Sequence, residues 1–129
     1  MVRTVDRKKA GGYITKAENS LRISKIAIRE EAYDAAVMNA VHSAINSLDA
    51  LTTSFQGKRA SGAHTEILEL IKGIFPPREY EEIQKQFNTL VGKKNESEYQ
   101  PDLMGLKDAE SAIKSAERIF EKVKAKLQS

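Results

Sequence analysis

The stretch "EEAYDAAVMNAVHSAINSLDAL", Glu30 to Leu51, decides the fold, because its apolar residues recur at the spacing of an α-helix. The same spacing continues past its end, so we predict one helix from about Ala32 to Phe55. The apolar stripe has intervals of three and four residues: Tyr33, Val37, Ala40, Ala44, Leu48, Leu51 and Phe55. A second apolar row widens this face, and alanines keep the helix slim. We therefore expect this helix to be central, with close neighbours.

Helical spacing elsewhere in the chain predicts four more helices. They run from about 13 to 29, from 61 to 75, from 77 towards 98 and from 106 to 127. Ser61 is a plausible N-cap of the third, and Pro77 suits the first turn of the fourth. Five helices with short connections and no convincing strand pattern predict an all-α, up-and-down antiparallel bundle.

The composition restricts the classes of function. The chain has 129 residues, which suggests one domain. It has no cysteine and two histidines, so we expect neither a metal site nor a cofactor. There is no run of about 18 apolar residues, and hence no predicted membrane span. The basic beginning of the chain lacks the apolar segment of a secretory signal, so we expect a cytoplasmic protein.

Positive charge gathers at the beginning of the chain. Residues 1–16 contain Arg3, Arg7, Lys8, Lys9 and Lys16 against Asp6, while the formal charge of the whole chain is +3. We expect residues 1–12 to be a basic arm, divided by Gly11-Gly12 from a single domain over residues 13–129. The arm is either a solvated end of the chain or a contact for phosphates.

Two parts of the chain resemble a known family. In the second helix, Tyr33 to Val37 reads Tyr-Asp-Ala-Ala-Val. It resembles the Tyr-Asp-x-Ala-Val step of the HEPN family (higher eukaryotes and prokaryotes nucleotide-binding). An aromatic pair follows that step in the family, and here Val41 and His42 stand at those positions.

The C-terminal part is similar to the family's Arg-x-x-Ala-Asp-Tyr segment and the helix after it. The corresponding residues are Lys94, Ser97, Glu98 and Tyr99, of which only the tyrosine is unchanged. Phe120 falls where the family's last helix has a buried aromatic residue. The resemblance extends over nearly the whole chain.

The resemblance implies a helical bundle that often dimerises through its second and third helices. Some members are metal-independent ribonucleases with an arginine and a histidine four to six residues apart. Others are toxins neutralised by a small nucleotidyltransferase encoded beside them, and others only bind nucleotides or act as scaffolds. We therefore expect a homodimeric accessory or interaction domain that partners a small nucleotidyltransferase and binds nucleotide or RNA phosphate. The alternative is an endoribonuclease toxin.

The nuclease alternative depends on Arg59 and His64, which have the spacing of the family's catalytic pair. A histidine can move the proton of a ribose 2′-hydroxyl near neutral pH, and an arginine can hold the phosphate. Lys58 and free N–H groups at the start of the third helix would add to an anion site. The pair lies between the second and third helices, whereas the ribonucleases have theirs beyond the third. The other interpretation is a capping turn.

A polar stripe on the second helix is a further candidate. Asn39, His42, Asn46 and Asp49 are spaced three, four and three residues apart and so share one helix face. The stripe is either part of a binding groove or the solvent-facing side of an amphipathic helix.

Lys93, Lys94, Glu98 and Tyr99 are the last candidates. Lysine lacks the bidentate fork of the family's arginine, so we do not expect a phosphate site that depends on that fork. The structural interpretation is a Lys94–Glu98 pair one helical turn apart, with Tyr99 folding the loop onto the core.

Overall fold

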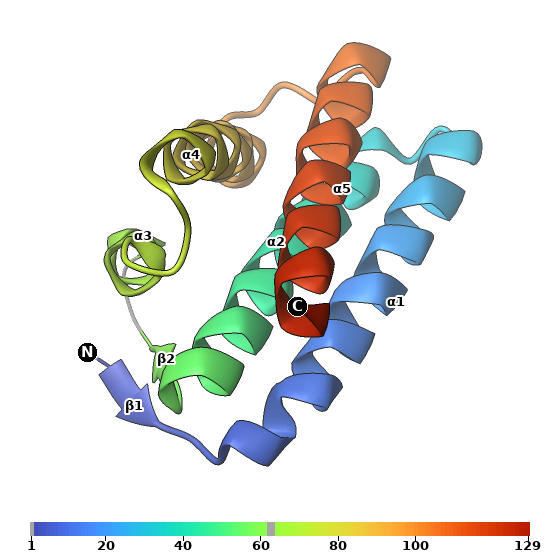
Figure 1. Cartoon of the computed structure of the whole chain (residues 1–129). Helices are drawn as coiled ribbons and strands as arrows, with labels where there is room; N and C mark the ends of the chain where they lie inside the picture. Colours follow the sequence, from blue (N-terminus) through green and yellow to red (C-terminus); the bar gives the residue numbers. More distant parts are fainter. Residues whose placement is uncertain (1, 62–63) are drawn as a thin grey trace.

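The computed structural model of the chain describes residues 2–61 and 64–129. In chain order the elements are β1 (Val2–Thr4), the short 3₁₀ helix η1 (Arg7–Lys9), α1 (Ala10–Arg29), α2 (Tyr33–Gln56), β2 (Lys58–Ala60), α3 (His64–Ile71), α4 (Pro77–Tyr99) and α5 (Leu106–Gln128). Helices dominate the described chain, which confirms the predicted all-α bundle (Figure 1).

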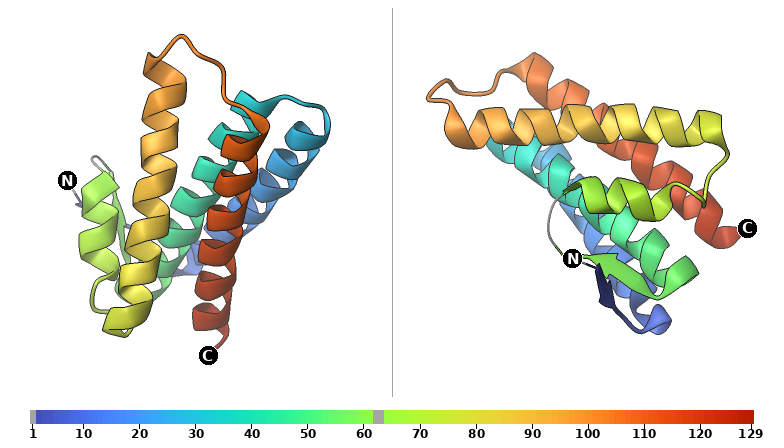
Figure 2. Two further views of the ribbon diagram at one scale, coloured as in Figure 1. Left: turned by 90° about the horizontal axis from the view of Figure 1, so that it is seen from above. Right: turned by 90° about the vertical axis from the view of Figure 1, so that its left-hand side faces the viewer.

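The helices form two groups that cross each other. In Figure 1, α1, α2 and α5 run side by side, while α3 and α4 are seen nearly end-on. The second group therefore lies across the first, as the turned views also show (Figure 2). The loop between α4 and α5 and the turn between α1 and α2 lie at one end of the molecule. The two strands lie at the other.

Helix α2 is the centre of the core, as its wide apolar face predicts. It packs most extensively on α1 and α5 and also contacts α3 and α4. Its buried apolar residues include Val37, Val41, Leu48 and Leu51, each fully removed from solvent. Each such side chain contributes about 1.5–3 kcal/mol through burial. Phe55 departs from the predicted stripe, because its side chain is 40% exposed at the end of the helix.

Small residues let α1 and α2 approach closely, and buried serines link the two backbones. Ser24 of α1 donates a hydrogen bond to the Ala36 carbonyl of α2 over 2.6 Å. In return, Ser43 of α2 donates to the Ala17 carbonyl of α1 over 2.8 Å. All four residues are buried. These bonds satisfy hydroxyls that would otherwise destabilise the contact.

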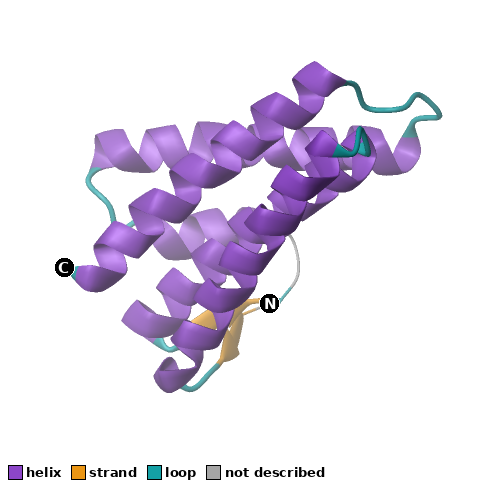
Figure 3. Ribbon diagram, turned by 90° about the vertical axis from the view of Figure 1, so that its right-hand side faces the viewer, coloured by secondary structure: helices purple, strands orange, loops and turns teal. Residues whose placement is uncertain are grey.

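The structure corrects two helix starts and adds a pair of strands. Helix α1 begins at Ala10, so Gly11 and Gly12 lie inside its first turn and do not separate an arm from it. Helix α3 begins at His64 rather than at Ser61. The chain also forms strands where none was expected, because residues 58–60 pair with β1 (Figure 3). Pairing between segments so far apart in sequence leaves no local periodic signal.

Gly57 ends α2 and brings the first segment of the chain against it. Its φ of 63° is left-handed, and its N–H caps the helix by donating to the Thr53 carbonyl over 3.0 Å. Its own carbonyl accepts a 2.9 Å hydrogen bond from the Val5 N–H. A Cβ atom here would lie 3.3 Å from Arg7 Nε and 3.5 Å from the Val5 carbonyl oxygen.

We expect Gly57→Ala to lower the free energy of unfolding by about 1–2 kcal/mol, the cost of a left-handed L-residue. Gly92→Ala is the matched control. Gly92 is exposed within α4, with no heavy atom within 4 Å of an added Cβ, so this change should stabilise the helix by about 0.5–1 kcal/mol. Urea unfolding measures both. If Gly57→Ala stabilised the protein as Gly92→Ala should, the turn at Gly57 would carry no conformational strain.

Candidate anion-binding site

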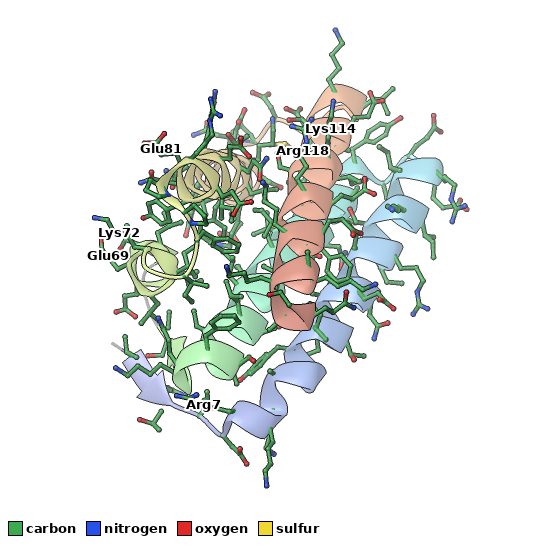
Figure 4. The ribbon with its side chains drawn as sticks, in the orientation of Figure 1. Arg7, Glu69, Lys72, Glu81, Lys114 and Arg118 are labelled. Atoms are coloured by element: carbon green, nitrogen blue, oxygen red, sulfur yellow. The ribbon has the colours of Figure 1, made fainter. Side chains whose placement is uncertain are left out.

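The basic beginning of the chain is paired with the segment after α2. β1 and β2 are antiparallel, with Arg3 opposite Arg59 and Thr4 opposite Lys58. Arg7 lies at the same end of the molecule, beside the strands (Figure 4). Positive side chains from residues far apart in sequence are thus collected at one end. The electrostatic field at this end favours an anionic partner.

A buried carboxylate orients one of these cations. Asp49 of α2 has a side chain only 3% exposed, and its Oδ2 atom lies 3.1 Å from Arg59 Nε. The Arg59 side chain remains 37% exposed. Its guanidinium carbon lies 5.3 Å from the centre of the Tyr13 ring on α1. Arg59 therefore joins α2, β2 and α1, with part of its fork still open to solvent.

Burial and charge act against each other in this pair. Burial raises the pKa of Asp49, and the hydrogen bond and charge of Arg59 oppose the rise without cancelling it. Burial lowers the pKa of Arg59, but its hydrogen bond with Asp49 and that carboxylate's charge leave the pKa above its ordinary value. Arg59 thus stays fully charged.

A basic pocket of about 380 Å³ lies beside this pair. It is lined by Val5, Asp6, Lys9, Gly12, Tyr13 and Lys16. The Lys16 ammonium lies 5.9 Å from the centre of the Tyr13 ring, the same ring that Arg59 approaches. One oxygen of Asp6 is occupied by the Lys8 N–H at 3.0 Å. Two lysines beside an aromatic face suit a phosphate and a stacked base.

The spacing of these residues could have indicated the site. Lys9, Tyr13 and Lys16 are four and three residues apart, which places them on one face when the helix begins at Ala10. A helix assumed to begin at Tyr13 leaves Lys9 outside that face. The basic residues are therefore recognisable from sequence, whereas their arrangement around Tyr13 is not.

The polar stripe of α2 is divided by the structure. The Asn39 amide donates to the Ala35 carbonyl and the Asn46 amide to the His42 carbonyl, each over 2.9 Å within the helix itself. His42 is exposed. Asp49 alone of the four is buried, and it is paired with Arg59 of β2. The shared face thus holds three solvent-side residues and one interior carboxylate.

The pair Arg59 and His64 is separated between two elements. Arg59 lies in β2 and is paired with Asp49 of α2, whereas His64 is the first residue of α3. The His64 side chain lies outside the part of the chain that the structure describes, as do residues 62–63. Lys58, the third member of this group, is exposed opposite Thr4.

The last predicted cluster is structural. Lys94 and Glu98 form a 3.0 Å ion pair within α4, and Lys93 contacts Asp108 of α5 at 3.0 Å. The prediction that Tyr99 folds onto the core is wrong, because Tyr99 is 76% exposed. The loop is instead held by Asp34, whose Oδ1 accepts hydrogen bonds from Ser97 Oγ and the Met104 N–H, each over 3.2 Å.

Two kinds of feature are absent from the described residues. Within residues 2–61 and 64–129, no three histidine or acidic side chains are grouped to hold a metal ion. No helix in the same residues has the length and apolar character needed to cross a membrane.

Comparisons with known proteins relate this fold to one family. The sequence model of the HEPN domain family matches residues 10–126. No curated protein matches the sequence. Among solved structures, the chain is similar to TT1696 from Thermus thermophilus, with a TM-score of 0.76 and 19% sequence identity. The match covers 92% of this chain and 98% of that one, and it shows that the two share a fold.

The Asp49 carboxyl should give stability a defined pH dependence. Its pKa is raised in the folded protein, so the folded state binds this proton more tightly than the unfolded chain, where the pKa is about 3.9. The stabilisation is complete below about pH 4 and is lost as the pH rises through the raised pKa. Each unit of pKa difference corresponds to about 1.4 kcal/mol.

Asp49→Asn removes this titration. We therefore expect the unfolding free energy of the wild type, minus that of Asp49→Asn, to fall as the pH rises from the acid limit and then to level off. Urea unfolding of both proteins across a pH series measures the difference. If this difference in unfolding free energy instead grew with pH, the pKa of Asp49 would be lowered. The attraction of Arg59 would then outweigh the effect of burial on that pKa.

Proposed function

The chain belongs to the HEPN domain family, and from this premise we propose that it is a binding domain for the phosphate of a nucleotide or an RNA. The observation that carries the proposal is the arrangement around Tyr13. Lys9 and Lys16 line the basic pocket with this ring, and Arg59 lies over the ring at 5.3 Å. Phosphates would pair with the cations, and a base would stack on the Tyr13 ring in place of the Lys16 ammonium, which lies over it at 5.9 Å.

The surroundings of the basic pocket support the same proposal. Arg3 and Lys58 extend the positive surface along the two strands, and Arg7 continues it beside Gly57. Arg3, Arg7 and Lys58 are exposed, so a chain of phosphates could follow this surface beyond the pocket. Binding to such a surface is expected to weaken as salt concentration rises, because counterions compete for the phosphates.

Replacing Lys9 and Lys16 together by alanine should weaken binding of a fluorescein-labelled single-stranded RNA. The slope of log affinity against log salt concentration should become shallower by about 0.7 for each phosphate that the variant no longer neutralises. Fluorescence anisotropy over a KCl series measures both quantities, and AMP as competitor reports the mononucleotide. Lys72→Ala is the control, because Lys72 is an exposed lysine directly after α3 (Figure 4). Equal weakening in this control would contradict a site at the pocket.

The same samples test the ribonuclease alternative. We expect the labelled RNA to stay intact in EDTA, because the Nε atom of Arg59 is engaged by Asp49. Cleavage that disappears in both Arg59→Ala and His64→Ala, with helicity retained by circular dichroism, would replace the binding proposal by a catalytic one.

We further propose that the chain acts with a protein partner, a small nucleotidyltransferase, as the family resemblance implies. The observation that favours a protein contact is apolar exposure at the α4–α5 corner. Tyr99, Leu103 and Leu106 are 76%, 85% and 48% exposed there. Apolar side chains grouped at a surface are typical of protein interfaces.

Co-expression with a nucleotidyltransferase encoded beside this gene should give a complex that co-purifies. Leu103→Glu should abolish the complex, because it places a charge in the apolar contact, while RNA binding at the distant basic pocket stays unchanged. Size-exclusion chromatography with light scattering measures the complex and also the homodimer expected of the free chain. Retention of the complex by Leu103→Glu would place the partner elsewhere.

A further inference from the structure

A polar groove lies between α4 and α5 and shares no lining residue with the basic pocket. Its volume is about 690 Å³, within the range of small-molecule sites. Lys85 and Gln86 line it from α4, and Ser111, Ser115 and Arg118 line it from α5. Figure 4 shows Arg118 on the side of α5 that faces α4, whereas Glu81 points away from the groove.

The groove lining contains an ion pair at one end and is positive beyond it. Glu82 of α4 and Lys122 of α5 meet across it at 3.0 Å and neutralise each other. One turn further along each helix stand Lys85 and Arg118. Neither has an ion-pair partner within 4 Å among the described residues. The two walls therefore each supply one cation to the same space, which favours a ligand with a compact negative charge.

Thr89 in the lining donates its hydroxyl to the Lys85 carbonyl over 2.9 Å, but other polar groups around these cations lack partners within the described part of the protein. The Oε1 atom of Gln86 is buried and accepts no hydrogen bond from the described residues. A buried acceptor without a hydrogen bond destabilises the folded protein by about the free energy of its desolvation. A rotation about the last side-chain torsion, which is soft in glutamine, would turn it towards the groove. The hydroxyls of Ser111 and Ser115 also make no hydrogen bond within the described chain and stand on the opposite wall.

We propose that this groove binds a small phosphorylated polyol, with its phosphate between Lys85 and Arg118 and its hydroxyl groups on Gln86, Ser111 and Ser115. The class of ligand follows from the lining, which pairs two cations with neutral hydrogen-bonding groups and has no aromatic side chain. The Glu82–Lys122 ion pair already neutralises the charges at one end of the lining, which favours a compact ligand with its phosphate at Lys85 and Arg118. This site is independent of the proposed function at the basic pocket.

Isothermal titration calorimetry with ribose 5-phosphate tests the proposal on the full chain, with inorganic phosphate and ribose as separate titrants. The wild type should bind ribose 5-phosphate more tightly than either. Lys85→Ala and Arg118→Ala should each weaken binding by about tenfold or more, because each removes a charge-assisted hydrogen bond. Lys107→Ala, at an exposed lysine at the start of α5, should bind as the wild type does, and so should the Lys9/Lys16 double variant.

Gln86→Met separates a ligand role from a structural one. It removes the unpaired buried acceptor, so the free protein should melt at a temperature higher by roughly 2–8 °C. The same change should weaken ribose 5-phosphate binding. A residue with only a structural role would not move the two measurements in opposite directions. Absence of measurable binding, equal affinity for inorganic phosphate, or loss of binding in the Lys9/Lys16 variant alone would overturn the proposal.

Discussion

The close contact between α1 and α2 is the constraint on which the other elements depend. Alanines at the interface let the two backbones approach, and the reciprocal bonds of Ser24 and Ser43 fix their relative position. The pair presents one continuous surface on which α5 packs, since α5 contacts both helices. An ion pair between Lys25 of α1 and Glu117 of α5, at 2.8 Å, joins the same surfaces at their solvent edge. Because it is half exposed, that pair adds little stability, and the apolar contact beneath it supplies most of the packing energy.

A single buried carboxylate links this helical core to the charged end of the molecule. Asp49 faces inward from α2, and an unpaired charge at that depth would be costly. Arg59 neutralises it from β2, which in turn pairs with β1. The strand pair therefore has a fixed position on the bundle although each strand is only three residues long. Cations that would repel one another on a free arm are held together by the backbone pairing and by this carboxylate. The positive end is a consequence of core packing, not of the first residues alone.

Local sequence patterns predict the helices of this fold, and long-range contacts account for what they miss. The long helices follow from apolar spacing, and α4 ends near Pro101 as proline chemistry requires. The strands escaped prediction because their pairing partners, Arg3 and Arg59, are far apart in the chain. The same limit applies to the candidate site. The basic residues are visible in the sequence, but the burial of Asp49 depends on which elements cover α2, and no spacing within α2 contains that information.

The two anion-binding surfaces proposed for this chain differ in a way that elementary recognition chemistry can separate. At the basic pocket, Tyr13 offers a ring face between two cations, so a ligand with a nucleobase gains stacking energy there in addition to charge pairing. The α4–α5 groove has no such ring in its lining and instead presents hydroxyl and amide groups. A base would leave these groups unpaired, and the cost of burying them would oppose binding. A phosphate is attracted to both surfaces, so it cannot distinguish them. Selection between the two therefore rests on the neutral part of each ligand.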